Sequence, residues 1–248
     1  MRSVSAAVAA AILAASCVGY AQTATITAPP PPHPIPQSKL LMQLEDFAQL
    51  HRYANDNAAL SATQKGRVVF MGDSITDGWG RGTGDFFPGK PYVNRGISGQ
   101  TTPQMLVRFR QDVIDLHPVA VVILAGTNDI AGNTGPSTLE MTEDNLASMA
   151  ELAAANHIHV ILASVLPAFD YPWRPGLTPA PKIQAINAWL KVYCAEKKFT
   201  YLDYYTPMGD EKGGMKPGLS KDGVHPTADG YAIMGPLAEQ AIAKALHK

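Results

Sequence analysis

The chain has 248 residues, of which 46% are hydrophobic and 17% are charged, a composition that suits a globular protein with a sizeable core. Its 20 basic and 21 acidic residues give a formal net charge of -1 at pH 7. A nearly neutral chain without a basic run is not expected to bind nucleic acid.

The N-terminal stretch has the pattern of a secretory signal peptide. Met1-Arg2-Ser3 precedes an Ala-rich apolar run that extends to Val18 and is followed by small residues. This run is too short for a comfortable membrane span, which needs about 20 apolar residues. We therefore expect residues 1–21 to be removed, leaving no stable membrane span, and the protein to be periplasmic or secreted. The less favoured alternative is a lipoprotein acylated at Cys17, because such sites prefer Leu where this chain has Ala14.

A linker and a leading helix are predicted next. Residues 22–37 should form an extended linker, because the prolines between Pro29 and Pro36 cannot continue a helix or pair in a sheet. The alternative is a polyproline site for a partner. From Ser38 to about Asn57 apolar residues recur at helical spacing, which predicts a helix over residues 38–57. We expect this helix to pack on the outside of a single domain that spans residues 38–248.

Beyond residue 57, short apolar runs alternate with helical patterns. The expected strands are residues 67–71, 92–94, 119–125, 159–165 and 200–204, and the expected helices are residues 103–116, 139–156, 181–198 and 227–246. This alternation predicts an α/β fold, a three-layer domain with a parallel five-stranded sheet and helices on both faces. The continuous apolar run of residues 119–125 fits a strand that is buried on both sides.

No disulfide, metal or cofactor is expected. Once residues 1–21 are removed, Cys194 is the only cysteine, and its apolar helical setting predicts a buried, inert thiol. His157 and His159 have no cysteine or carboxylate cluster beside them in the sequence. The chain also contains no zinc motif and no Gly-rich phosphate-binding loop.

Two polar motifs near opposite ends of the predicted domain indicate a serine hydrolase. The first is Gly72-Asp73-Ser74 and the second is Asp222-Gly223-Val224-His225. A serine hydroxyl is a poor nucleophile at neutral pH, so it needs a base and a third group that orients the base. Ser74, His225 and Asp222 can fill these roles. The structural alternatives are a helix cap at the first motif and a turn at the second.

Two further polar blocks lie between these motifs. Asn94-Arg95-Gly96-Ile97-Ser98-Gly99 and Gly126-Thr127-Asn128-Asp129 each follow a predicted strand, as the first motif does. Because open parallel sheets bind ligands at the carboxyl ends of their strands, the three are predicted to converge on one edge, where the C-terminal motif can join them. Ser98 is a rival nucleophile, but the chain lacks the Gly-x-Ser-x-Gly elbow of α/β-hydrolases. An Asx turn or a cap is the structural alternative for Asn128 and Asp129.

The four blocks, in this order, resemble the SGNH hydrolases, also called the GDSL esterase/lipase family. The resemblance extends from about Val68 to the C-terminus, and it implies a flavodoxin-like SGNH hydrolase fold. The chain departs from the family name only at Ile75, where Leu is common. That position is expected to pack in the interior, so the difference changes no catalytic role.

The resemblance also implies a role for each polar residue. Ser74 would be the nucleophile, and Asp222 and His225 would complete the triad. The backbone N–H groups of Ser74 and Gly99 and the side-chain amide of Asn128 would form the oxyanion hole.

The substrate is less closely defined by the sequence. Residues 169–177 hold three aromatic side chains, and among them Tyr171 and Trp173 are candidate substrate-binding residues that can stack on sugar rings. The alternative is that they pack a surface loop. The Gly126-to-Gly132 block, the leading helix and the lack of a long apolar lid resemble bacterial exported acetylxylan-type and aryl esterases.

The expected function is therefore that of a serine esterase. It would hydrolyse short-chain esters, acetyl esters above all, of carbohydrates or related alcohols, so that its partner is a small-molecule or saccharide ester. One alternative is a thioesterase or a lysophospholipase-like lipid hydrolase. The other is a non-catalytic module that binds carbohydrate or the cell envelope. The sequence predicts no oligomeric state.

Overall fold

The computed structural model describes residues 37, 41 and 44–247. The expected signal peptide, the linker up to residue 36 and Cys17 lie outside these residues. Within the described part of the chain, no helix is both long enough and apolar enough to cross a membrane.

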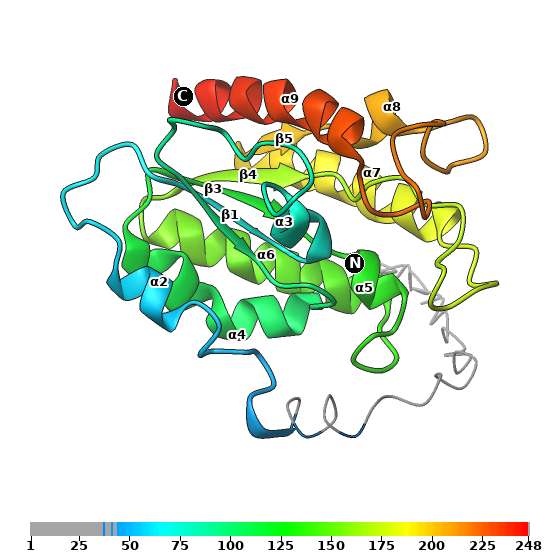
Figure 1. The fold of residues 1–248 in the computed structure, drawn as a ribbon, viewed down its shortest axis with the longest axis horizontal. Helices are drawn as coiled ribbons and strands as arrows, with labels where there is room; N and C mark the ends of the chain where they lie inside the picture. The colour runs from blue at the N-terminus through cyan, green and yellow to red at the C-terminus, as the bar shows by residue number, and fades with distance from the viewer. Residues whose placement is uncertain (1–36, 38–40, 42–43, 248) are drawn as a thin grey trace, which may run out of the picture.

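A parallel sheet forms the centre of the fold (Figure 1). In chain order, its five strands are β1 (Val68–Gly72), β2 (Tyr92–Gly96), β3 (Ala120–Leu124), β4 (His159–Ala163) and β5 (Thr200–Leu202). They pair in the order β2-β1-β3-β4-β5, and every pair is parallel. The strand order therefore reverses between β1 and β3. In open parallel sheets, ligands bind where the order reverses, in the crevice outside the carboxyl ends of the strands.

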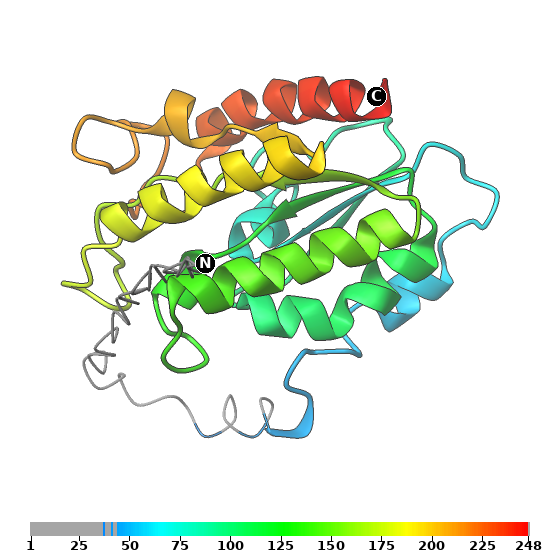
Figure 2. The same cartoon turned by 180° about the vertical axis from the view of Figure 1, so that it is seen from behind.

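Helices cover both faces of the sheet, as Figures 1 and 2 show from opposite sides. On one face lie α4 (Thr102–Asp112), α6 (Leu139–Ala155) and α7 (Ala180–Lys197). The other face is covered by α9 (Ala228–Leu246) and by the short α3 (Ser74–Gly78). The remaining short helices are α2 (Ala54–Ala58), the 3-10 helix η1 (Ile114–Leu116), α5 (Thr127–Ile130) and α8 (Tyr205–Met208). The predicted three-layer α/β fold is confirmed.

The apolar runs of the sequence are explained by burial on both faces. In β1, Val69 and Met71 pack with the helices of one layer, whereas Val68 and Phe70 pack with those of the other. Successive side chains of a strand point to opposite faces, so a strand between two helical layers needs apolar residues at every position. All five residues of β3 are buried for the same reason.

The leading helix predicted over residues 38–57 is wrong as a continuous element. Turns separate residues 44–45 from α2, and Gln49 has a φ of 54°. The carboxylate of Asp46 accepts hydrogen bonds from the backbone N–H groups of Leu50 at 2.8 Å and His51 at 3.3 Å. A short acidic side chain that accepts hydrogen bonds from backbone N–H groups a few residues away competes with the helical hydrogen bonds of that segment. The predicted helix over residues 103–116 is likewise two elements, because α4 ends at Asp112 and η1 follows.

Candidate active site

Ser74 is held at the carboxyl end of β1 by a short, well-anchored helix. Asp73 is the N-cap of α3, and its side chain accepts a hydrogen bond from the backbone N–H of Ile75 at 2.9 Å. The carbonyl of Ile75 accepts a hydrogen bond from the hydroxyl of Tyr231 at 2.7 Å, and the Ile75 side chain is buried. The helix cap foreseen as an alternative therefore exists, but it is formed by Asp73 and leaves the Ser74 hydroxyl available for chemistry.

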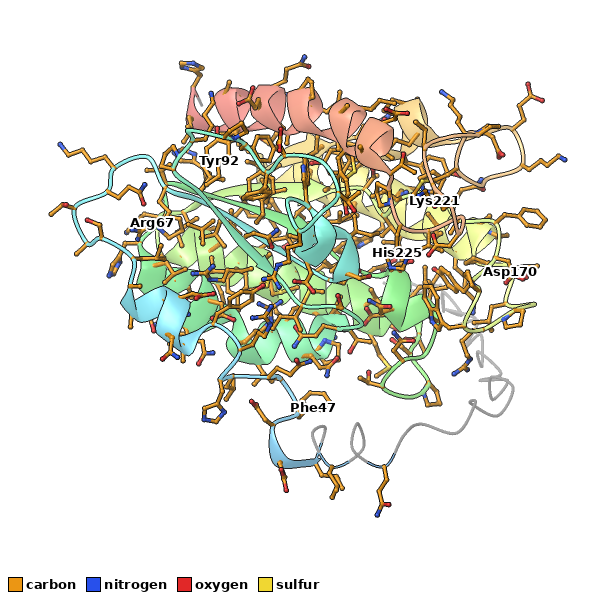
Figure 3. The ribbon with its side chains drawn as sticks, viewed as in Figure 1. Phe47, Arg67, Tyr92, Asp170, Lys221 and His225 are labelled. Carbon is orange, nitrogen blue, oxygen red and sulfur yellow. The ribbon has the colours of Figure 1, made fainter. Side chains whose placement is uncertain are left out.

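Ser74, His225 and Asp222 are joined by two hydrogen bonds. Ser74 Oγ lies 2.8 Å from His225 Nε2, and His225 Nδ1 lies 2.6 Å from Asp222 Oδ2. With the Nδ1 proton donated to the carboxylate, Nε2 of a neutral imidazole is an acceptor for the serine proton. Figure 3 shows His225 at the end of the molecule that also carries Asp170 and Lys221, far from Arg67, which precedes β1. Residues 151 positions apart in the chain thus meet at one edge of the sheet.

The carboxylate of Asp222 is held in its ionised form. Partial burial raises its pKa, but hydrogen bonds from the His225 ring and from the backbone N–H groups of His225 and Val224 outweigh this effect. The result is a pKa well below the usual range of a carboxyl group. One oxygen accepts the two backbone bonds at 2.8 and 3.0 Å, so the other is directed at the ring. An ionised Asp222 can both orient the imidazole and stabilise its protonated form.

The two further oxyanion candidates lie just beyond the ends of β2 and β3. Gly99 has a φ of 79°, a conformation that favours glycine, and a Cβ at this position would meet nothing within 4 Å, so the space before it is open. Asn128 is buried in α5, and its Nδ2 donates to the carbonyl of Gln100 at 2.9 Å. An amide nitrogen carries two hydrogens, and the second can be donated to a substrate oxygen.

Arg108, which the sequence interpretation missed, holds the Gly99 loop against the ends of β1 and β2. Its side chain is fully buried and donates to the carbonyl of Gly72 at 3.1 Å, the carbonyl of Arg95 at 2.8 Å and the side chain of Gln100 at 2.6 Å. It also forms an ion pair with Asp112 at 3.1 Å. The ends of β1 and β2 and the Gly99 loop are thereby tied to one guanidinium. The available signal was an Arg and an Asp one turn apart on the apolar face of a predicted helix.

Two buried acids, Asp73 and Asp129, are sequence neighbours of Ser74 and Asn128. Burial raises the pKa of Asp73 to about 7 and that of Asp129 to about 6. Asp129 accepts hydrogen bonds from the backbone N–H of Thr102 at 3.1 Å and from its hydroxyl at 2.6 Å, and so connects α5 to the start of α4. Asp129 therefore has a structural role at the base of the site.

The aromatic loop contributes one ring to the site rather than two. Tyr171 was expected to bind substrate, but its side chain is fully buried and its hydroxyl lies 2.8 Å from Thr127 Oγ1. Trp173 stacks on Tyr171 with the ring centroids 5.0 Å apart, and it lies 6.1 Å from the ring of His225. Tyr171 thus supports Trp173, and Trp173 is the one of these two rings that lies beside His225.

The rival nucleophile is engaged elsewhere. Ser98 Oγ donates a hydrogen bond to Asp77 Oδ2 at 2.6 Å, which is an interaction with an acid on α3 rather than with a histidine. Among the residues that the structure describes, no group of three or more His, Cys, Asp or Glu is placed to hold a metal ion. Cys194 is buried in α7.

Comparison with known proteins identifies the family. The model of the GDSL-like lipase/acylhydrolase family matches residues 70–233. A solved structure of a GDSL-like lipase from Bacteroides thetaiotaomicron is 54% identical, covers 80% of this chain and 99% of its own, and superposes with a TM-score of 0.77. A candidate acylhydrolase from Bacteroides fragilis is 51% identical over 81% of this chain and 99% of its own, with a TM-score of 0.78.

A curated relative is more distant. Esterase TesA of Pseudomonas aeruginosa is 31% identical over 137 residues, which are 54% of this chain and 60% of that esterase. The chain therefore matches less than two thirds of this relative's length. The match of the family model over most of the described residues shows that the chain belongs to the GDSL-like lipase/acylhydrolase family.

Proposed function

We propose that the protein is a serine esterase that removes short acyl groups, acetyl above all, from carbohydrates or related alcohols. The observation that carries this proposal is the hydrogen-bonded chain from Ser74 through His225 to Asp222, with distances of 2.8 and 2.6 Å. A non-catalytic binding module has no need of this arrangement. The family of the chain, with its lipases and acylhydrolases, supports the same reaction class.

The geometry supports the following reaction. Ser74 Oγ attacks the ester carbonyl while His225 Nε2 takes its proton, and ionised Asp222 stabilises the resulting imidazolium. The negative charge that develops on the carbonyl oxygen is met by the backbone N–H groups of Ser74 and Gly99 and by the amide of Asn128. His225 returns the proton to the leaving alcohol, and a water molecule then releases the acyl group from Ser74 by the same steps.

A groove that adjoins one member of the triad supports a polyhydroxylated substrate. It has a volume of about 350 Å³ and adjoins Asp222, and Asp170 and Asp210 also line it. Phe169, on the same groove, is 59% exposed. Carboxylates accept hydrogen bonds from sugar hydroxyls, and an exposed aromatic ring offers a face on which a sugar can stack.

The charge of this groove argues against the lipid and thioester alternatives. None of the described residues that line it is a lysine or an arginine. The phosphates of a phospholipid headgroup or of an acyl-coenzyme A would be repelled by the three aspartates. A neutral saccharide carries no such penalty. The groove therefore favours an uncharged alcohol.

Turnover of p-nitrophenyl acetate by the purified protein tests the proposal. Wild type should be active and Ser74→Ala inactive, and activity should fall from acetate to butyrate to octanoate. In a second comparison, acetylated xylan should be a better substrate than lysophosphatidylcholine or acetyl-coenzyme A. Absence of any turnover that depends on Ser74 would favour the binding module, whereas a preference for octanoate and lysophospholipid would favour the lipid hydrolase.

Export is part of the same proposal. The signal-peptide pattern of residues 1–21 supports a protein that acts outside the cytoplasm, where saccharide esters of the cell surface or the medium are accessible. Mass spectrometry of the mature protein should show Gln22 as its first residue. A lipid-modified N-terminal Cys17 would instead establish the lipoprotein alternative.

A further inference from the structure

Asn133, just beyond α5, is bonded to both oxyanion candidates and to the aromatic loop. Its Nδ2 donates to the side-chain oxygen of Asn128 at 2.8 Å and to the carbonyl of Gly99 at 3.2 Å. Its Oδ1 accepts a hydrogen bond from the indole N–H of Trp173 at 3.2 Å. One part-buried side chain therefore connects the ring beside His225 to the amide that would bind the oxyanion.

The chemistry of the partners determines which way each amide faces. An indole N–H is only a donor, so the Asn133 atom that meets Trp173 must be the oxygen, and its NH₂ group must face the other way. Two NH₂ groups cannot hydrogen-bond each other, so Asn128 turns its oxygen toward the NH₂ group of Asn133. The NH₂ group of Asn128 then faces the carbonyl of Gln100, which is only an acceptor.

We propose that Trp173 and Asn133 form an orientation relay that keeps the Asn128 amide with its N–H groups toward the oxyanion hole. This inference rests on the proposed function, because it assigns Asn128 its oxyanion role. Asn133 is then a positioning residue that acts through Asn128. A reversed Asn128 amide would present its oxygen to the developing negative charge and would raise the barrier it is meant to lower.

The relay is separate from the contacts that hold the loop in place. The backbone N–H of Asn133 donates to the carbonyl of Asn128 at 3.0 Å, and Thr134 Oγ1 lies 2.9 Å from Thr101 Oγ1. A substitution that keeps the size of the Asn133 side chain but replaces its NH₂ donor by an acceptor should leave these contacts intact. Asn133→Asp is such a change, because a carboxylate still accepts from the indole but offers no donor to Asn128.

Steady-state kinetics with p-nitrophenyl acetate provide the test. Asn133→Asp should lower kcat by about a hundred- to a thousandfold, which is the usual effect of losing one oxyanion donor, and should change KM by less than about threefold. Thr134→Ala, the matched control in the same loop, should keep the kcat of wild type. Thermal unfolding of each variant verifies that the fold is retained.

A double-mutant cycle separates the relay from a direct effect of the new charge. In an Asn128→Ala background, Asn133→Asp should lower kcat by less than about threefold, because the group through which it acts is missing. An equally large loss in both backgrounds would overturn the relay in favour of a through-space effect. A wild-type kcat in the single variant Asn133→Asp would also overturn it.

NMR of the Asn128 side chain tests the relay independently of the proposed function, because it requires no enzyme activity. The side-chain NH₂ resonances of Asn128, identified by their loss in Asn128→Ala, should shift in Asn133→Asp and remain in place in Thr134→Ala. Unmoved resonances in Asn133→Asp would refute the relay even in an active esterase. If wild type lacks turnover that depends on Ser74 but the resonances shift, the proposed function fails and the orientation effect stands.

Discussion

The ionisation of Asp73 is expected to lower the free energy of unfolding as the pH rises. This carboxyl group precedes the candidate nucleophile and is 1% exposed, and burial raises its pKa from 3.8 to about 7. Asn has the same shape, and its side-chain oxygen can still accept the hydrogen bond from the backbone N–H of Ile75. Asp73→Asn therefore removes the titration and keeps the helix cap.

The sign and size of the effect follow from the two pKa values. Between pH 3.8 and pH 7 the folded state binds the Asp73 proton more tightly than the unfolded state does, so the free energy of unfolding falls as the pH rises. The contribution is complete below pH 3.8 and is lost above pH 7. At about 1.36 kcal/mol per pH unit, the wild type should lose about 2 kcal/mol by pH 5 and about 4 kcal/mol by pH 8.

Urea unfolding of both proteins at pH 5 and pH 8 measures this loss. The stability of Asp73→Asn relative to wild type should increase by about 2 kcal/mol between these two pH values, which is the difference between the two losses. Asp144→Asn, which changes an exposed acid on α6, should show no such increase. A relative stability of Asp73→Asn that stays constant or falls with pH would refute the argument that burial dominates the Asp73 site.

Four further predictions concern the catalytic groups and their support. Ser74→Ala should abolish esterase turnover without unfolding the protein, and Ser98→Ala should keep it. Asn128→Ala should lower kcat by about a hundredfold or more in steady-state assays, since it removes one oxyanion donor. His225→Ala should abolish most of kcat/KM in the same assay, because it removes the base that accepts the serine proton. Arg108→Met should lower the free energy of unfolding, measured in urea, by about 3–5 kcal/mol because it strands a buried carboxylate, and a loss below about 1 kcal/mol would contradict that role.

The fold and the meeting of the four blocks could be predicted because they depend on local patterns. A run such as residues 119–125 carries its own signal of burial on both faces, and a parallel sheet brings the carboxyl ends of its strands to one edge. Ser74 and Asn128 follow β1 and β3 directly, so their positions are set by the strands. His225 joins them at 2.8 Å from Ser74 Oγ, as its motif indicated.

The features that were mispredicted depend on side-chain direction and on long-range contacts. The helical spacing of residues 38–57 contains no measure of how strongly the Asp46 carboxylate competes for backbone N–H groups. The aromatic loop likewise does not reveal that Tyr171 points inward to Thr127, a residue 44 positions away. The bond from Trp173 to Asn133 spans 40 positions and has no periodic signature.

The hydrogen-bond network that provides donors to the carbonyls at the ends of the strands also shapes the candidate oxyanion hole. Where β1 and β2 end, the buried carbonyls need donors from outside the sheet, and Arg108 supplies them to Gly72 and Arg95. The same guanidinium holds the Gln100 side chain, and the carbonyl of Gln100 accepts a hydrogen bond from the Asn128 amide. Loss of Arg108 should therefore reduce stability and kcat together, because one group serves both. The part-buried Asn133 lies outside this shared set, so a change there can alter kcat while the free energy of unfolding stays nearly constant.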